Sequence, residues 1–362
     1  MSIEKIIRKR RILIVERPSL AILLFMNSIR KYSPVFFFSL ERTDFLHLRY
    51  KFNSGIPLRG KNLEERIKYL EKTKREVIKK VVETVKIVKP DIIIAPLSEE
   101  GVFILSNLND DRVLLTQLAK KILNKKFQQN FKGLLNVPTL NGKLKYPLVV
   151  KPAIGRGSEN VHVVKSKEEF ERIKRKFEEK NREYVVQSFI PGNLYVTFNF
   201  FSNGDNILGT VFCMRKKDIR IVRDFYEKKI RSFFRKINFI GFSSIQCKIS
   251  DEKLCALEIH PRISHVNPEV LLYFFKRRFR KGRVVVKNPR EEIRLFRLKK
   301  FSKNKILRYA SYLLYENFTK TVMHKQLLFS FWTLFHHTPS FLSMFLKESK
   351  KLFHKQIFIS SY

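Results

Sequence analysis

Residues 146–158 read Tyr-Pro-Leu-Val-Val-Lys-Pro-Ala-Ile-Gly-Arg-Gly-Ser, and Val161-His162-Val163-Val164 follows. This pattern predicts a strand, a loop and a second strand. Lys151 ends the first strand and would place a fixed cation in a cleft, while Gly155 and Gly157 would let backbone N–H groups approach phosphate oxygens. The Walker A pattern G-x-x-x-x-G-K-[ST] is absent. The segment therefore predicts a phosphate-binding hairpin, although Gly-Arg-Gly-Ser alone would be an ordinary basic turn.

A second informative segment follows about a hundred residues later. Gly241–Lys248 and Leu254–Arg262 predict two strands joined by a short turn, with Gln246 opposite Glu258. Glu258 and His260 would project on one face because side chains repeat every two positions along a strand. Oxygen ligands that converge in this way suit Mg²⁺, whose remaining positions are filled by nucleotide phosphates and water. A solvated carboxylate is the alternative for Glu258 taken alone.

The N-terminal part alternates strand and helix. Ile12–Val15, Val35–Phe38 and Asp91–Pro96 are apolar runs of strand length, and Asn62–Lys89 has apolar residues at helical spacing. Such alternation predicts a parallel sheet covered by helices. The next helix begins at Ser98–Gly101, beyond the carboxyl end of a strand, where open α/β sheets commonly bind ligands. No G-x-G-x-x-G pattern follows the first strand, so a dinucleotide site there is not expected.

The middle of the chain has longer, alternating strands. They predict an α+β module with antiparallel sheet. The expected strands are Tyr184–Phe189, Tyr195–Phe201, Ile207–Met214, Ser243–Lys248 and Leu254–Ile259.

Composition indicates a folded protein that works beside anions. The 362 residues are 44% hydrophobic and include only three cysteines, which cannot form a disulfide framework or a four-cysteine zinc site. Met1–Arg11 lacks the apolar stretch of a signal peptide. We therefore expect a cytoplasmic protein. Lys and Arg number 74 against 33 acids, a net charge of +41, which predicts an anionic partner. A genome poor in G and C would explain part of the lysines, but not the scarcity of acids.

The C-terminal part is basic, aromatic and helical in pattern. Within it, Gln326–Leu346 has no formal charge but contains Pro339 and polar neighbours near its centre. Three interpretations remain open: helices packed on the preceding domain, helices on an anionic membrane surface, or a segment that spans the bilayer. Single-stranded RNA could also contact interleaved basic and aromatic residues, but no RNA-binding motif supports a nucleic-acid partner.

Three motifs, in this order and spacing, resemble the ATP-grasp superfamily and especially its carbamoyl phosphate synthetase-like, carboxylate-amine ligase branch. They are Lys151–Ser158, Val185–Gly192 and Glu258–Arg262. Leu123–Phe127 and Asn136–Thr139 look like the motifs that open the nucleotide-binding module in this family. The resemblance covers roughly residues 11–275.

The resemblance implies ATP and Mg²⁺, or Mn²⁺, as cofactors. It implies that Lys125 and Lys151 contact phosphates, that the loop Gly155, Arg156, Gly157 and Ser158 closes over them, and that Gln187, Ser188, Phe189 and Ile190 follow the adenine. Metal ligands would be Gln246, Glu258 and His260, and the transferred phosphoryl group would be stabilised by Arg262, with Arg215 as a second candidate. Glu99, Glu100 and Arg156 are plausible neighbours of the substrates.

Four domains or lobes follow from these patterns. We expect an N-terminal parallel-sheet α/β domain (1–111), an ATP-grasp module (112–278) with a smaller lobe (112–190) and a larger lobe (191–278) of antiparallel sheet, and a basic helical extension (279–362) that could touch an anionic membrane surface. The expected function is an ATP-dependent ligase that activates a small carboxylate as an acyl phosphate for attack by an amine.

Several residues depart from the family pattern. Leu194 stands where an acidic residue usually holds the ribose, Ser188 replaces a glutamate, His260 an asparagine and Asn124 an aspartate. The alternative function is therefore a degenerate, non-enzymatic ATP-grasp protein that binds nucleotides, a membrane surface or nucleic acid. The sequence predicts neither the substrates nor the oligomeric state.

Overall fold

The computed structural model of the chain describes residues 8–17, 22, 25–26, 29–30, 33–41, 52–131, 134–135, 137–138, 144–156, 158–192, 194–203, 207–212, 224–251, 253–263 and 285–287. Two compact units divide the chain, Met1–Pro289 and Arg290–Tyr362, and every described residue lies in the first. Among the described residues, no helix combines the length and apolar character needed to cross a membrane. The predicted boundaries at 111, 190 and 278 stay predictions.

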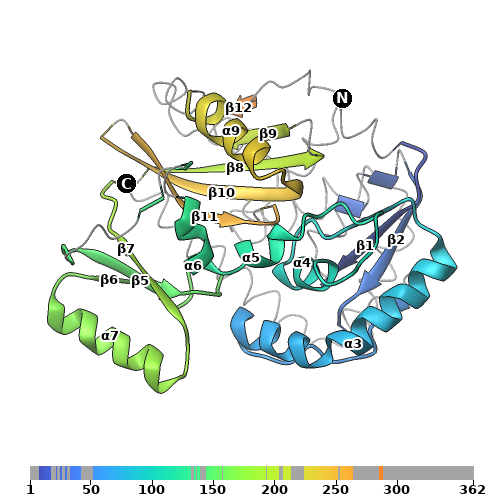
Figure 1. Cartoon of the computed structure of the whole chain (residues 1–362), viewed down its shortest axis with the longest axis horizontal. Coiled ribbons are helices and arrows are strands. Elements are labelled where there is room, and N and C mark those ends of the chain that lie inside the picture. Colours follow the sequence, from blue (N-terminus) through green and yellow to red (C-terminus); the bar gives the residue numbers. More distant parts are fainter. Residues whose placement is uncertain are drawn as a thin grey trace, which may run out of the picture. The chain divides into compact units, whose positions relative to one another are not determined.

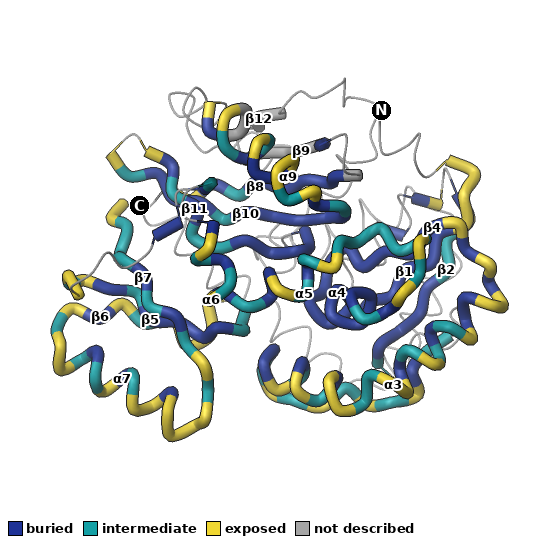
Figure 2. Tube along the Cα trace, in the orientation of Figure 1, coloured by how far each residue is buried: buried dark blue, intermediate teal, exposed yellow. Residues whose placement is uncertain are grey.

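The N-terminal residues form a parallel four-stranded sheet, as predicted (Figure 1). Its order is β3 (Phe52–Asn53), β2 (Val35–Ser39), β1 (Ile12–Glu16) and β4 (Ile92–Ile94), and every pairing is parallel. β1 is buried along its whole length, because both of its neighbours and the covering helices exclude water (Figure 2). Glu16, at its carboxyl end, is therefore buried as well.

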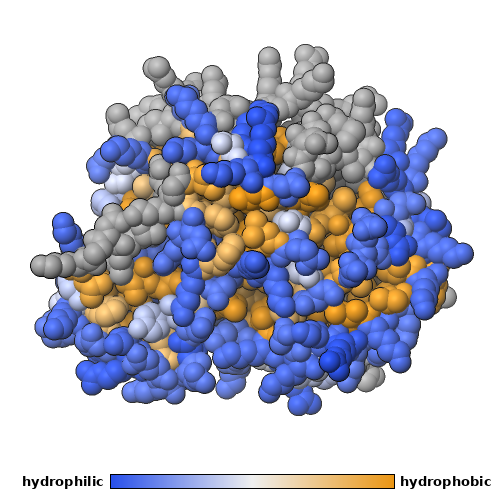
Figure 3. All heavy atoms as spheres, in the orientation of Figure 1, coloured by the Kyte–Doolittle hydropathy of each residue, from blue (hydrophilic) through white to orange (hydrophobic). Residues whose placement is uncertain are grey.

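The long helix α3 (Leu63–Val88) covers this sheet. It begins at Asn62, whose side chain accepts a hydrogen bond from the Glu65 N–H, and it ends at Lys89 in the left-handed conformation. Its apolar residues repeat at helical spacing and pack into the core, while hydrophilic side chains cover its outer face (Figure 3). The predicted helix over 62–89 is confirmed.

A small antiparallel sheet follows, with order β6 (His162–Val164), β5 (Leu148–Pro152) and β7 (Tyr184–Ser188). The helix α7 (Lys167–Glu179) packs Phe170, Ile173 and Phe177 against this sheet. The predicted strand, loop and strand around Lys151 are confirmed as β5 and β6. This sheet has its own apolar core, separate from the others.

The larger sheet has the order β11 (Lys253–His260), β10 (Ile240–Ser250), β8 (Leu194–Asn203), β9 (Ile207–Phe212) and β12 (Val285–Lys287). Its pairings are antiparallel except that of β9 with β12. A π-helix (Tyr226–Ile230) and α9 (Arg231–Lys236) pack on it, with Phe200 and Phe234 ring centroids 4.1 Å apart. The α+β prediction for this part is confirmed.

One expectation for the C-terminal extension is wrong. Val285–Lys287 lie in the region predicted to be helical, but they form the strand β12. Consecutive valines favour a strand because their branched side chains are restricted in a helix. The other residues of the predicted extension, 279–284 and 288–362 with Gln326–Leu346, lie outside the described residues.

Short helices connect the sheets. They are α4 (Glu99–Leu105), α5 (Leu118–Ile122), α6 (Lys125–Gln128) and a 3₁₀ turn (Gln129–Phe131). α4 packs closely on β1, since a Cβ at Gly101 would lie 2.5 Å from the Val15 carbonyl oxygen. Only glycine allows this approach, which brings Glu99 and Glu100 to the carboxyl end of β1.

Candidate active site

Two lysines and a glutamate meet where the small sheet faces β11. Lys125 Nζ lies 3.0 Å from Glu258 Oε1, and Lys151 Nζ lies 3.8 Å from Glu258 Oε2. Lys151 belongs to β5, Lys125 to α6 and Glu258 to β11. All three are largely buried, so each charge depends on its neighbours for compensation. The sequence analysis named all three as site residues, and the structure brings them together.

Backbone contacts hold both lysines in place. Asn124 caps α6, and the Lys125 N–H donates to the Ala153 carbonyl at 2.8 Å. The Lys125 ammonium also donates to the Gly155 carbonyl at 2.7 Å. Lys151 Nζ donates to the Leu257 carbonyl at 3.1 Å. Main-chain oxygens therefore orient both cations, in addition to their ion pairs with Glu258.

A buried glutamine ties α6 to β11. Gln128 Nε2 donates to the Ile259 carbonyl at 2.8 Å, and the Ile259 N–H donates to Gln128 Oε1 at 2.9 Å. This reciprocal pair fixes Lys125 beside Glu258, because Lys125 and Gln128 share one turn of helix and Ile259 follows Glu258. The sequence analysis did not single out Gln128.

Electrostatics keep the site charged and asymmetric. Burial alone would raise the pKa of Glu258, but Lys125, His260 and Lys151 together lower it to about 2. Burial lowers the pKa of Lys151 to about 8, with Glu258 opposing and Lys125 reinforcing that shift. Burial also lowers the pKa of His260 to about 4. At neutral pH Glu258 is thus an anion and His260 a neutral imidazole.

The predicted metal ligands lie together on β10 and β11. Gln246 is opposite Glu258 in the strand register, and His260 Nε2 lies 3.5 Å from Glu258 Oε1. Among the described residues no group of three or more His, Cys, Asp or Glu side chains is arranged for a metal ion. A carboxylate, an imidazole and an amide oxygen are a donor set for one cation, and Glu258 would have to leave its lysines to bind it.

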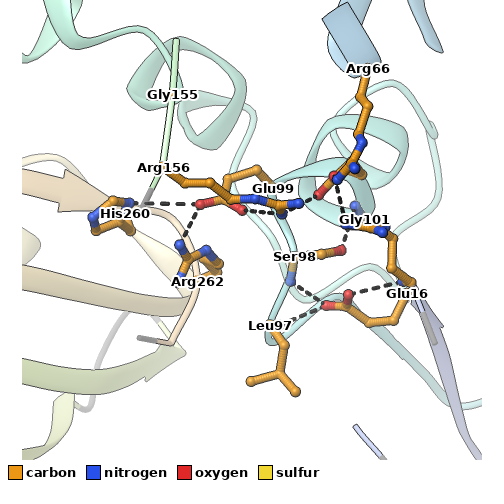
Figure 4. Close-up of polar contacts among 12 residues, drawn as sticks. Glu16, Arg66, Leu97, Ser98, Glu99, Gly101, Gly155, Arg156, His260 and Arg262 are labelled. Carbon is orange, nitrogen blue, oxygen red and sulfur yellow. Dashed lines mark hydrogen bonds and ion pairs between the residues drawn. The ribbon is translucent and has the colours of Figure 1, made fainter. Parts of the chain in front are cut away.

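Arg262 pairs with an acid from the N-terminal part. Its Nη2 lies 2.5 Å from Glu99 Oε1, and both side chains are buried. Burial would raise the pKa of Glu99, but Arg262 and Arg156 hold it well below its usual range. The Ile263 N–H donates to the Pro96 carbonyl at 2.9 Å, which brings the end of β11 to the start of α4. Figure 4 shows Arg262 and His260 both directed at Glu99.

Comparison with solved structures identifies this architecture. An L-amino acid ligase from Bacillus licheniformis superposes with a TM-score of 0.56 at 18% identity, over 74% of this chain and 71% of that one. A carboxyaminoimidazole ribonucleotide synthase from Aspergillus clavatus, complexed with ATP, gives 0.51 at 12% identity over 73% and 77%. The chain has the ATP-grasp fold. No protein-family model and no curated protein matches the sequence. The resemblance seen in the motifs is thus confirmed at the level of fold.

The residues predicted to follow the adenine of an ATP-grasp site lie at the end of β7. Gln187 is buried and pairs with Val149, and Ser188 is the last residue of β7. The Phe189 N–H donates to the Pro147 carbonyl at 3.3 Å. Their contact with a base stays a prediction.

Lys248 is a further cation at this end of β7. Its Nζ donates to the Ile190 carbonyl at 2.6 Å and lies 5.0 Å from the Phe189 ring centroid and 5.2 Å from that of Tyr195. Burial lowers its pKa. Lys248 therefore occupies one acceptor position of the Ile190 carbonyl, and Ile190 is one of the residues predicted to follow the adenine. Nothing in the local sequence marked it, because its partners come from other strands.

Neighbouring residues of the predicted phosphate loop contact groups of opposite charge. Gly155 accepts from Lys125, whereas Arg156 Nη1 lies 3.4 Å from Glu99 Oε2 and 3.1 Å from Glu100 Oε2. Ser158 adopts a positive φ of 60°. Gly157 and Arg215 lie outside the described residues.

Glu16 is a buried carboxyl that the sequence analysis did not single out. Its Oε1 accepts from the Leu97 N–H at 2.6 Å and from the Ser98 N–H at 2.9 Å, which fixes the turn that starts α4 (Figure 4). Burial raises its pKa to about 7, against the lowering effect of these hydrogen bonds. In the sequence, β1 is recognisable only as an apolar run. A single glutamate after such a run does not indicate whether its carboxyl group is buried or exposed.

Proposed function

We infer that the chain is an ATP-dependent ligase that activates a carboxylate as an acyl phosphate for attack by an amine. The observation that carries this inference is the meeting of Lys125 and Lys151 with Glu258 between the small sheet and β11. Similarity to an L-amino acid ligase and to synthetases complexed with ATP or ADP supports it.

The charges at this site suit a triphosphate. Both lysines now share one carboxylate, so they hold one more positive charge than Glu258 neutralises. Phosphate oxygens would compete for the two ammonium groups, since charge-assisted hydrogen bonds to phosphate are strong. Glu258 would then be free to bind a cation, and each buried charge would keep a partner. In this proposal, nucleotide binding replaces the ion pairs between the lysines and Glu258 with contacts from the lysines to phosphate and from Glu258 to the cation.

The chemistry needs positioning and charge neutralisation more than covalent participation by the protein. A carboxylate oxygen of the substrate attacks the γ-phosphorus of ATP, the bond to ADP breaks, and an acyl phosphate forms. An amine then attacks the acyl carbon, phosphate leaves, and the amine releases one proton as the amide forms. Lys125 and Lys151 would hold the phosphates. Arg262 would leave its ion pair with Glu99 and contact the transferred phosphoryl group instead.

A divalent cation fits this proposal. Glu258, Gln246 and His260 would hold Mg²⁺ or Mn²⁺, which supplies neutralisation of the phosphate charge when bound. The neutral imidazole of His260 suits Mn²⁺ better than Mg²⁺. The proposal therefore includes one divalent cation, and the experiments should use both Mg²⁺ and Mn²⁺.

The test is release of ADP from ATP by the purified full chain, with pools of small carboxylic acids, with amines, and with hydroxylamine to trap an acyl phosphate as a hydroxamate. We expect ADP and hydroxamate in equal amounts, only when a carboxylate is present, and loss of both in Lys151→Met. Lys72→Met, an exposed lysine of α3, is the matched control. ADP release that needs no carboxylate and gives no hydroxamate would contradict the proposal.

A non-catalytic nucleotide-binding protein on the same fold is the second candidate. Leu194 in place of the usual acidic residue favours it, because a leucine cannot accept hydrogen bonds from ribose hydroxyls. This candidate predicts saturable ATP binding without ADP release under every condition above. Cytoplasmic location, and contact of 279–362 with an anionic membrane, stay predictions.

A further inference from the structure

Three arginines surround one buried carboxylate at the start of α4. Glu100 is fully buried, and its oxygens lie 3.3 Å from Arg17 Nη1, 3.5 Å from Arg66 Nη1 and 3.1 Å from Arg156 Nη1. We call Arg17, Arg66 and Arg156 the arginine cluster. No part of the proposed phosphate or metal chemistry uses Arg17 or Arg66.

The arginine cluster comes from three separate elements. Arg17 follows β1, Arg66 lies in the first turns of α3, and Arg156 lies in the loop after β5. Their side chains are 24%, 20% and 23% exposed, whereas the Glu100 side chain is 0% exposed. The guanidinium groups therefore stand between a buried carboxylate and solvent, where they can meet a second anion.

The charges in this region do not balance among the guanidinium–carboxylate contacts of the described residues. Arg17 also contacts Glu41 at 2.5 Å, and Arg156 also contacts Glu99 at 3.4 Å, while Glu99 pairs with Arg262 at 2.5 Å. These guanidiniums exceed the carboxylates they contact by one: Arg17, Arg66, Arg156 and Arg262 against Glu41, Glu99 and Glu100.

Among the described residues, Arg66 is the member of the arginine cluster that has no carboxylate of its own. Its Nε donates to the Gly60 carbonyl at 3.0 Å, and its Nη1 shares Glu100 with the other two arginines. Burial, and then the positive charges of Arg17 and Arg156, lower its pKa. Glu16 lies near Glu100, but among the described residues its hydrogen bonds come from backbone N–H groups and from the Ser98 side chain. An added anion would relieve the repulsion between these guanidiniums.

We propose that the arginine cluster binds one oxyanion group, a carboxylate or a phosphate, of the molecule on which the proposed ligase acts. Guanidinium groups present paired N–H donors that match both kinds of oxyanion. That the bound molecule is a substrate rests on the proposed function. That an oxyanion binds here is inferred from the geometry of the arginine cluster alone. It assigns to the substrate a charged group distinct from the reacting centre.

The position of the arginine cluster suits that role. Arg156 follows Gly155, whose carbonyl binds Lys125, so one loop joins the arginine cluster to the proposed phosphate site. On the other side, Glu99 lies between Arg156 and His260, and His260 contacts Glu258. A small substrate held by the arginine cluster would therefore lie near the proposed site of transfer.

The experiment uses the full chain and two probes, acetate and inorganic phosphate, at constant ionic strength. Binding is followed by the NMR shifts of arginine Nε–H groups. We expect saturable binding of at least one probe, weakened about tenfold or more in Arg66→Gln. Arg75→Gln, an exposed arginine of the same helix, should leave the affinity unchanged. The probe that depends more on Arg66 identifies the group as carboxylate or phosphate.

The outcomes separate this proposal from the proposed function. Saturable binding that survives in Arg66→Gln, equal effects of Arg66→Gln and Arg75→Gln, or no saturation by either probe would overturn the arginine site, even if ATP binds normally. Loss of ATP binding with intact, Arg66-dependent anion binding would instead refute only the ligase. If Arg66→Gln does not fold, Arg17→Gln serves as the second variant, because Arg17 contacts the same carboxylate.

Discussion

Lys125 Nζ and Glu258 Oε1 are 3.0 Å apart, so a cation of α6 and a carboxylate of β11 form a direct ion pair. Lys151 reaches the other oxygen of the same carboxylate at 3.8 Å. The groups expected to hold a triphosphate and its metal ion are therefore already paired with one another, with one positive charge in excess. Binding of nucleotide has to separate them, and the affinity depends on how firmly each lysine is positioned.

Gln128→Leu should weaken the fold and the nucleotide site together. The substitution leaves the Ile259 N–H and carbonyl without their partners, which costs about 1–3 kcal/mol for a buried group. It also releases α6 from β11, so Lys125 would lose its position beside Glu258. Urea unfolding and ATP titration measure the two effects. Gln129→Leu, at the adjacent and less buried position, is the control. Lost stability with unchanged ATP affinity would show that Gln128 does not position Lys125.

Gly101→Ala should destabilise the chain by about 1–3 kcal/mol, the usual cost of overpacking. The added Cβ would lie 2.5 Å from the Val15 carbonyl oxygen and 3.0 Å from the Ala95 Cβ. Backbone cannot yield as a flexible side chain can, so α4 must move away from β1. Thermal unfolding measures this cost. A variant as stable as the parent would contradict the close approach of α4 to β1 at Gly101.

Glu16 should make stability fall as pH rises from about 4.5 towards 7. Burial raises its pKa from 4.5 to about 7, so the folded state binds a proton more tightly than the unfolded state does. The contribution is fully present below the unfolded pKa and is lost as pH rises through the folded pKa. Its size is at most about 3 kcal/mol.

The variant Glu16→Gln isolates this contribution, since the amide oxygen can still accept from Leu97 or Ser98 but cannot titrate. Urea unfolding at pH 5 and pH 8 should show a smaller loss of stability in the variant than in the parent. Equal losses in the two proteins would mean that the Glu16 pKa is not raised.

Much of the fold follows from local pattern. Short apolar runs between turn residues predicted β1, β2 and β4, and helical spacing of apolar residues predicted α3 to within a residue of its ends. These patterns are clear because β1 and β4 are buried on both faces, which gives continuous apolar runs, whereas α3 buries one face, which gives helical spacing. Val285–Lys287 is the exception, since three residues are too few for a period and the surrounding basic, aromatic sequence suggested helix.

Site residues could be predicted from the sequence only where they belong to motifs in the order typical of the ATP-grasp superfamily. Lys151 and Glu258 were predicted because each lies in such a motif. Glu16, Gln128 and Lys248 were not, since each is a single polar residue whose partners lie on other elements. The pairing of Arg262 with Glu99 likewise depends on how the start of α4 meets the end of β11.

The account is tested most directly by calorimetric titration of ATP, with Mg²⁺ and then with Mn²⁺, into the full chain, Lys151→Met and Lys72→Met. We predict saturable binding to the parent, an affinity at least about tenfold lower in Lys151→Met, and parental affinity in Lys72→Met. Lys151 is buried beside Glu258 and Lys72 is exposed on α3, so the comparison separates a specific phosphate contact from the general positive charge. Equal affinities in all three proteins, or no binding with either metal, would contradict the account.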